Sequence, residues 1–214
     1  MRIRVLIADD HAIVAEGLAH VIASHSDFEV IGRTADGREA LERALKLKPD
    51  IVVMDMAMPE MNGIEATRAI HDSIPGSRVI MLSMYTSPEY VYRALEAGAS
   101  GFVVKRSAAR ELVKAIRAVY AGRRYLSPRV AQELTERVIA KGVPRDTLAL
   151  LSARERQVLQ LLAEGKSVAD IADGLSVSPK TVETYRSRMF EKLDIHDLAS
   201  LVRFAIQHGV TSLE

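Results

Sequence analysis

The chain has 214 residues, with 29 basic and 28 acidic side chains and no cysteine. Without cysteine it can form neither disulfides nor thiolate metal sites, and no apolar stretch approaches the about 18 residues of a membrane span, so we expect a cytoplasmic protein without a membrane segment or secretion signal. The length exceeds the common size of one domain and predicts two domains, residues 1–121 and 148–214, joined by a partly helical linker over 122–147.

Four short apolar runs in the first half of the chain each lead into polar residues. The runs cover 5–8, 51–54, 79–82 and 102–104, and the residues that follow them are Asp9, Asp10, Asp55, Ser83 and Lys105. Because the carboxyl ends of parallel strands meet at one edge of an open α/β sheet, we expect these side chains to lie close together.

Helical patterns fall between these runs, as a doubly wound sheet requires. They cover 13–24, 37–47, 62–73, 88–97 and 108–120, and a further strand is expected over 29–34. A right-handed crossover at each strand–helix unit then gives an α/β fold, with a five-stranded parallel sheet covered by helices on both faces.

The residue types at the predicted sheet edge suit phosphoryl transfer. Crowded carboxylates repel one another unless a cation compensates them, and Mg²⁺ binds one or two carboxylates while leaving room for phosphate oxygens. Asp55 is the candidate nucleophile, because a carboxylate can attack phosphorus to give an aspartyl phosphate. Ser83 can donate a hydrogen bond, and Lys105 a positive charge, to a phosphoryl oxygen. His11 is interpreted as a loop residue rather than a ligand, since Mg²⁺ prefers oxygen.

Residues 1 to about 120 resemble the receiver domain of response regulators. The resemblance is carried by Asp9-Asp10, Asp55, Met58-Pro59, Asn62-Gly63, Ser83 and the stretch from Gly101 to Lys105. It implies a flavodoxin-like fold in which Asp10, Asp55 and the Ala57 carbonyl bind Mg²⁺, while Asp9 completes the acidic pocket. It also implies that a histidine kinase phosphorylates Asp55. Ser83 and Phe102 would then form a switch pair, in which the hydroxyl moves toward the phosphoryl group and the ring turns inward.

Capping signals near the other end of the chain predict a cluster of helices. Ser152 and Glu155 form a capping box before an apolar stretch that stops at Gly165. A short helix follows over 168–175, and Ser178-Pro179 begins a longer one that reaches Leu193. The last helix, over 197–208, carries an apolar stripe that suits either a dimer contact or the domain's own core, and the sequence leaves both open.

Residues 148–210 resemble the LuxR-type helix-turn-helix of the NarL and FixJ group of response regulators. The matching residues are 151–155, 165–167, Ile171, Ala172, Leu175, 181–183, Lys192 and Leu193. The resemblance implies a smaller all-α domain whose recognition helix, 179–193, enters the major groove of double-stranded DNA. Glu183, Thr184 and Ser187 would lie nearest the base edges, beside Thr181. Candidate phosphate contacts are Lys180, Arg186, Arg188 and Lys192.

Charge along the recognition helix is only modestly positive. Residues 179–192 carry four basic and two acidic side chains, so affinity for DNA should rely on dimerisation and should fall as salt rises. We therefore expect a homodimer in the active state, with RNA polymerase as a candidate partner. Whether phosphorylation acts by unmasking the recognition helix or by promoting dimerisation stays open at this point.

Two enzyme classes with related features fit the sequence poorly. A haloacid-dehalogenase-type phosphatase would need a second acid two residues after its nucleophile, where Ala57 stands. A nucleotide-binding module would need a glycine-rich turn where Asp9-Asp10-His11 stands. We therefore expect no turnover of a free substrate. The remaining alternative is a receiver that acts as a phosphate-independent interaction module.

Overall fold

The chain folds into two units, Met1–Pro144 and Arg145–Glu214. The computed structural model describes residues 2–84, 86–142 and 147–211. The predicted linker, 122–147, therefore includes residues 143–146, which lie outside the described residues.

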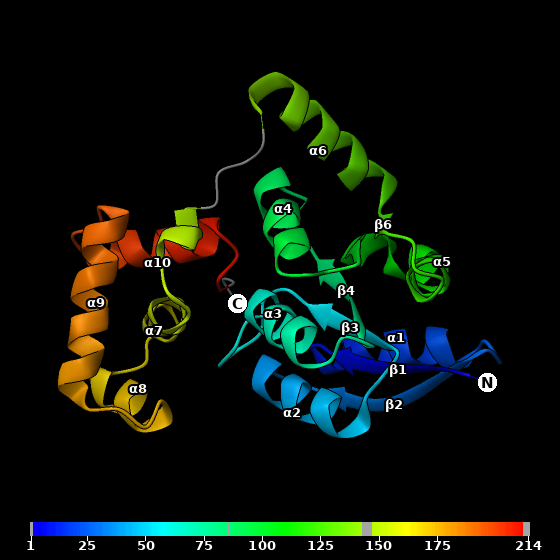
Figure 1. Cartoon of the computed structure of the whole chain (residues 1–214), viewed down its shortest axis with the longest axis horizontal. Helices are drawn as coiled ribbons and strands as arrows, with labels where there is room; N and C mark the ends of the chain where they lie inside the picture. The colour runs from blue at the N-terminus through cyan, green and yellow to red at the C-terminus, as the bar shows by residue number, and fades with distance from the viewer. Residues whose placement is uncertain (1, 85, 143–146, 212–214) are drawn as a thin grey trace. The chain divides into compact units, whose positions relative to one another are not determined.

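A parallel sheet of six strands forms the centre of the first unit (Figure 1). The strands are β1 (Ile3–Ala8), β2 (Phe28–Thr34), β3 (Ile51–Asp55), β4 (Arg78–Ser83), β5 (Gly101–Val104) and β6 (Tyr125–Leu126), in the order β2-β1-β3-β4-β5-β6. The predicted α/β class with its parallel sheet is confirmed, but the predicted number of five strands is wrong by one. Strand β6 has two residues, too few to show the periodicity from which a strand is recognised in sequence.

Helices cover both faces of this sheet. Helices α2 (Gly37–Leu47), α3 (Gly63–Ser73) and α4 (Pro88–Glu96) pack on one face, and α1 (Ala12–Ala23) and α5 (Ala108–Tyr120) on the other. Successive strand residues point to opposite faces. Met54 and Met81 thus join the core under α2 to α4, while Val53 and Ile80 join the core under α1 and α5. Burial of both faces explains why the strands read as unbroken apolar runs.

Helix α6 (Pro128–Lys141), which the sequence places in the linker, packs on the first unit. Its Val130 is fully buried in the core that also contains Tyr90 of α4. Figure 1 shows α6 alongside α4, and the Nε of Arg137 lies 3.3 Å from a carboxylate oxygen of Glu89 on α4. The predicted helical part of the linker therefore packs on α4 of the first unit.

Within residues 147–211 the second unit contains a short 3₁₀ turn, η2 (Thr147–Leu150), and four helices: α7 (Ala153–Ala163), α8 (Val168–Gly174), α9 (Pro179–Leu193) and α10 (Leu198–Gln207). The predicted capping box of Ser152 and Glu155 begins α7, and a second box of Ser167 and Asp170 begins α8. Their apolar faces share one core, so the smaller domain is helical as predicted. None of the described helices has the length and apolar character needed to cross a membrane.

Candidate functional site

The loop after β3 holds Asp55 against the start of helix α3. The Asn62 side chain accepts hydrogen bonds from the backbone N–H groups of Ile64 and Glu65 and so caps α3. The next residue, Gly63, approaches so closely that a Cβ there would lie 1.9 Å from the Asp55 carbonyl oxygen. The predicted Asn62-Gly63 turn thus requires glycine for contact with the candidate nucleophile, which the sequence alone does not reveal.

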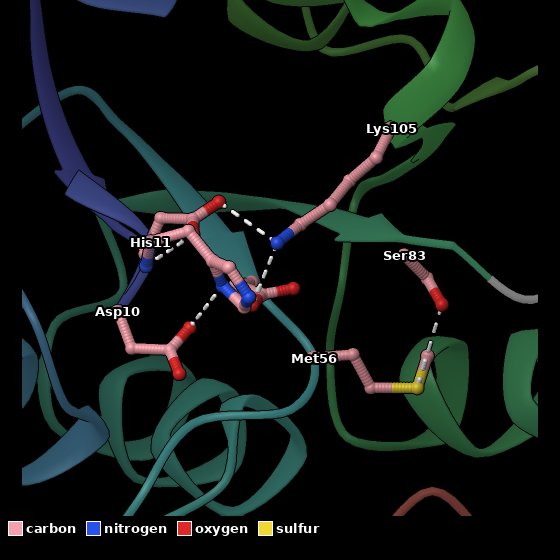
Figure 2. A network of polar contacts seen from close by, with 7 residues as sticks. Asp10, His11, Met56, Ser83 and Lys105 are labelled. Carbon is pink, nitrogen blue, oxygen red and sulfur yellow. Dashed lines mark hydrogen bonds and ion pairs between the residues drawn. The ribbon is translucent and has the colours of Figure 1, made fainter. Parts of the chain in front are cut away.

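The acidic residues and the lysine from three strand ends converge at one edge of the sheet (Figure 2). The Lys105 ammonium, at the start of the 3₁₀ turn η1 (Lys105–Ser107), lies 3.0 Å from Asp9 Oδ2 and 2.8 Å from Asp55 Oδ2. Asp9 and Asp55 are only 2% and 3% exposed. At that depth, water screens the ion pairs weakly, so these three groups form a tightly coupled cluster.

Burial sets the protonation of the candidate nucleophile. Loss of solvent, with the neighbouring carboxylates of Asp9 and Asp10, raises the pKa of Asp55 from its ordinary 3.8 to about 7, although Lys105 opposes the rise. Burial also acts to lower the pKa of Lys105, but the two carboxylates outweigh it and raise that pKa above its ordinary value. Lys105 therefore stays charged, while Asp55 is poised between its acid and its carboxylate at neutral pH.

The donor atoms at this edge suit a hard divalent cation. Ligand atoms of Asp9, Asp10, His11 and Asp55 all lie within 4.8 Å of one another. Three carboxylates outnumber the Lys105 ammonium, so a cation is electrostatically favoured, and carboxylate oxygen is the ligand that Mg²⁺ prefers. His11, which the sequence analysis set aside, lies at the rim with its Nδ1 2.8 Å from Asp10 Oδ1. Its backbone N–H donates to Asp9 Oδ1 at 3.0 Å and so helps to orient that carboxylate.

The predicted switch residues lie on the adjacent strands. Ser83 is buried at the end of β4, and its hydroxyl is directed at the Met56 sulfur, 3.9 Å away, rather than at the Lys105 ammonium (Figure 2). The Phe102 ring on β5 is fully buried. Ala57 lies in the loop two residues after Asp55 and is partly exposed. The structure thus brings Asp9, Asp10, Asp55 and Lys105 together and places Ser83 at the same edge with a different partner.

Helix α9 presents most of the predicted DNA-binding residues to solvent. The exposed ones are Lys180, Glu183, Thr184, Ser187, Arg188 and Lys192, whereas Thr181 and Arg186 are partly buried. Val182 and Met189 face the core, so the helix is divided into a packed face and an exposed face. Ser178 caps this helix by accepting from the Thr181 backbone N–H.

Two cations on α9 have partners within the protein. The Lys192 ammonium donates to the buried carboxylate of Glu155 at 2.7 Å, which ties α9 to the capping box of α7. The Arg186 guanidinium lies 3.6 Å from Glu183 and 5.4 Å from the centre of the Phe190 ring. Both were predicted from sequence as phosphate contacts, and a role for Lys192 in holding the domain together was missed because Glu155 is distant in the chain.

Both predicted domains match known protein families. Residues 5–117 match the response regulator receiver domain, and residues 149–205 match the luxR family of bacterial regulatory proteins. Response regulator GacA of Pseudomonas viridiflava is 40% identical over 208 residues, 97% of each chain. Response regulator UvrY of Escherichia coli (strain K12) is 37% identical over 212 residues, which are 99% of this chain and 97% of that protein.

A solved structure extends the likeness to three dimensions. In a structure of two RcsB dimers bound to two parallel DNAs, the matching chain is 27% identical with a TM-score of 0.61, over 97% of this chain and 99% of that chain. The chain belongs to the response regulators of the NarL and FixJ group, as its sequence predicts. It is a two-component response regulator, a DNA-binding transcription regulator controlled by phosphorylation.

Proposed function

We propose that Asp55 accepts a phosphoryl group from a histidine kinase and that this modification controls binding of a dimer to double-stranded DNA. The observation that carries the proposal is the buried Asp55 carboxylate, 2.8 Å from the Lys105 ammonium and beside two further acids. In this arrangement the ionised Asp55 can act as a nucleophile. The Lys105 ammonium can stabilise the negative charge that develops on a phosphoryl oxygen.

Phosphoryl transfer to Asp55 requires the kinase histidine, the Asp55 carboxylate and a proton from solvent. An Asp55 carboxylate oxygen forms a bond to phosphorus, the bond from phosphorus to the kinase histidine nitrogen breaks, and that nitrogen keeps the electron pair and takes a proton from solvent. Asp10, Asp55 and the Ala57 carbonyl, with Asp9, would hold Mg²⁺, which would neutralise charge on the phosphoryl oxygens. Because the acceptor is the protein's own aspartate, we expect no turnover of a free substrate.

Contacts of Lys105 and Ser83 with the phosphoryl group would favour one conformation of the phosphorylated chain over the other. Phosphate can shift a conformational equilibrium only if one conformation contacts it better than the other. Lys105 already pairs with Asp55, and the Ser83 hydroxyl lies at the same edge of the sheet, 3.9 Å from the Met56 sulfur, so both groups are placed to contact a phosphoryl oxygen. The rearrangement would pass to the second unit, which we place on DNA through α9.

The exposed face of α9 carries the proposed DNA contacts. Lys180 and Arg188 would pair with phosphates, while Glu183, Thr184 and Ser187 would face base edges, beside Thr181, Arg186 and Lys192. RcsB occurs as DNA-bound dimers, which supports a homodimer here. RNA polymerase is a candidate partner at promoters. A histidine kinase and chromosomal DNA would both be reached from the cytoplasm, where we place the protein.

Phosphodonor labelling tests this proposal directly. Purified chain incubated with acetyl phosphate and Mg²⁺ should gain one phosphoryl group by intact mass, with the modified peptide containing Asp55. Asp55→Asn should gain none, whereas Asp27→Asn, which changes an exposed acid, should be labelled normally. Phosphorylation should also tighten binding to duplexes selected from a random pool by the full chain. Normal labelling of Asp55→Asn would refute the assignment, and absence of labelling with phosphate-independent DNA binding would favour a receiver that acts as an interaction module.

A further inference from the structure

Residues 125–128 comprise strand β6, Ser127 and the first residue of helix α6. Strand β6 lies beside β5, the strand that carries Phe102 and leads to Lys105. The backbone N–H of Ser127 donates to the Phe102 carbonyl at 2.9 Å. The Ser127 hydroxyl accepts from the backbone N–H of Val104 at 3.3 Å. Ser127 is 2% exposed, so neither bond is easily replaced by water. Ser127, the residue before α6, therefore binds the backbone of β5 on both sides of Val103.

The same hydroxyl is fixed from its other side by helix α5. Ser127 donates its proton to the Glu111 carboxylate, which also accepts from the Tyr125 hydroxyl at 3.2 Å. Because a carboxylate is a strong acceptor, it holds the Ser127 hydroxyl in the orientation that leaves a lone pair for Val104. Ser127 thus connects α5, β5 and α6 through one oxygen atom.

The body of helix α6 is attached to α4, which follows the strand that ends in Ser83. Val130 is fully buried among side chains that include Tyr90 of α4. Farther along, the Arg137 Nε donates to Glu89 at 3.3 Å, and the Ser87 hydroxyl donates to the other oxygen of Glu89 at 2.7 Å. Helix α6 is therefore attached to α4, which follows the strand of Ser83, and through Ser127 to β5, which carries Phe102.

We propose that Ser127 is a positioning residue that couples helix α6 to the phosphoacceptor site. Ser127 holds β5 so that Phe102 and Lys105 keep their places in the unphosphorylated chain, and a shift of β5 toward a phosphoryl group moves α6. Release of Ser127 shifts the equilibrium toward the position of β5 that accommodates a phosphoryl group, so it also changes how readily Asp55 is phosphorylated. This inference rests on the proposed role of Asp55 as the phosphoacceptor. One hydrogen bond of this kind changes an equilibrium by roughly twofold to tenfold.

A pair of serine variants tests the coupling. Ser127→Ala should be labelled by acetyl phosphate about twofold to tenfold faster than wild type. It should also lose at least about half of the gain in DNA affinity that phosphorylation produces, and Ser127→Thr should restore both values. Ser107→Ala is the matched control, because the Ser107 hydroxyl donates to the Val104 carbonyl at 3.1 Å on the same strand but has no bond to α6. A merely structural role would lower the melting temperature without changing the ratio of affinities of the two forms.

Hydrogen exchange of the wild-type chain gives a second measurement that needs no variant. Phosphorylation should increase amide exchange in α6, residues 128–141, relative to α2. Unchanged exchange in α6, or equal effects of the Ser107 and Ser127 substitutions, would overturn the coupling while leaving Asp55 as the acceptor. Failure of the wild-type chain to be labelled at Asp55 would instead reject the proposed function, and the coupling with it.

Discussion

Replacing Asp55 by asparagine should stabilise the first unit when no divalent cation is present. Burial and the neighbouring acids raise the pKa of Asp55 from 3.8 to about 7, in spite of Lys105. Because one pKa unit corresponds to about 1.4 kcal/mol, this difference represents about 4 kcal/mol of unfavourable free energy in the ionised folded state. Asparagine carries no charge and leaves Lys105 paired with Asp9, so it should recover up to that amount.

The direction of the pH dependence follows from the raised pKa. The folded chain binds the Asp55 proton more tightly than the unfolded chain does, so the contribution of Asp55 to wild-type stability falls as the pH rises from about 4 through about 7. Below about pH 4 the carboxyl is neutral in both states, and the advantage of asparagine should vanish. Above about pH 7 the advantage should reach its full size and stay constant.

Calorimetric unfolding of the full chain in a chelator, from about pH 4 to about pH 8, measures this effect. Asp27→Asn is a control of opposite sign, because the hydrogen bond from Arg117 lowers the pKa of the exposed Asp27, and its loss should leave stability equal or lower at neutral pH. An Asp55→Asn protein that melts with wild type at about pH 8, or that keeps its full advantage at about pH 4, would refute the reasoning.

Four further changes have outcomes that follow from the structure. Only ionised Asp55 binds a cation well, so calorimetric titration should show Mg²⁺ affinity falling about tenfold per pH unit below about pH 7. A Mg²⁺ affinity that does not change with pH in this range would contradict a buried acid in the site. Lys192→Met leaves Glu155 buried without its ammonium and should cost the second unit about 1–2 kcal/mol in denaturant unfolding, less than a fully buried pair because the Lys192 side chain is 40% exposed. The same variant should reduce the salt dependence of DNA binding by less than Arg188→Gln does, because Glu155 already pairs with the Lys192 ammonium, whereas Arg188→Gln should reduce the slope by about 1. A wild-type slope for Arg188→Gln would show that Arg188 does not contact phosphate. Glu183→Gln removes a negative charge from the exposed face of α9, so it should tighten binding to random DNA and weaken any preference for cytosine, and unchanged binding to both would exclude Glu183 from the interface.

Local features of the sequence predicted most of the fold. The capping box of Ser152 and Glu155 is a short-range pattern, and it begins a helix where one was expected. The ends of the apolar runs predicted that Asp55 and Lys105 would meet, because parallel strands share one carboxyl edge.

Contacts between distant residues could not be read in this way. The sequence predicted only a partly helical linker over 122–147, yet the backbone and hydroxyl of Ser127 bind β5, more than twenty positions earlier in the chain. The Lys192 ammonium appeared free for DNA until the fold brought Glu155 to it. Gly63 appeared as an ordinary turn residue, although it is the close approach of the Asp55 carbonyl that excludes a side chain there. Such roles depend on tertiary packing, which leaves no local pattern.

The full burial of Phe102 limits how this regulator can respond. A phenylalanine ring has no hydroxyl that water could satisfy, so moving it to the surface would cost about 1.5–3 kcal/mol. An outward ring would then occur in roughly one molecule in ten to one in 150. Because the Phe102 ring rarely leaves the interior, its rotation can contribute little to a change of conformation. A structural change at β5 should therefore reach neighbouring elements through displacement of its backbone and not through rotation of the Phe102 side chain.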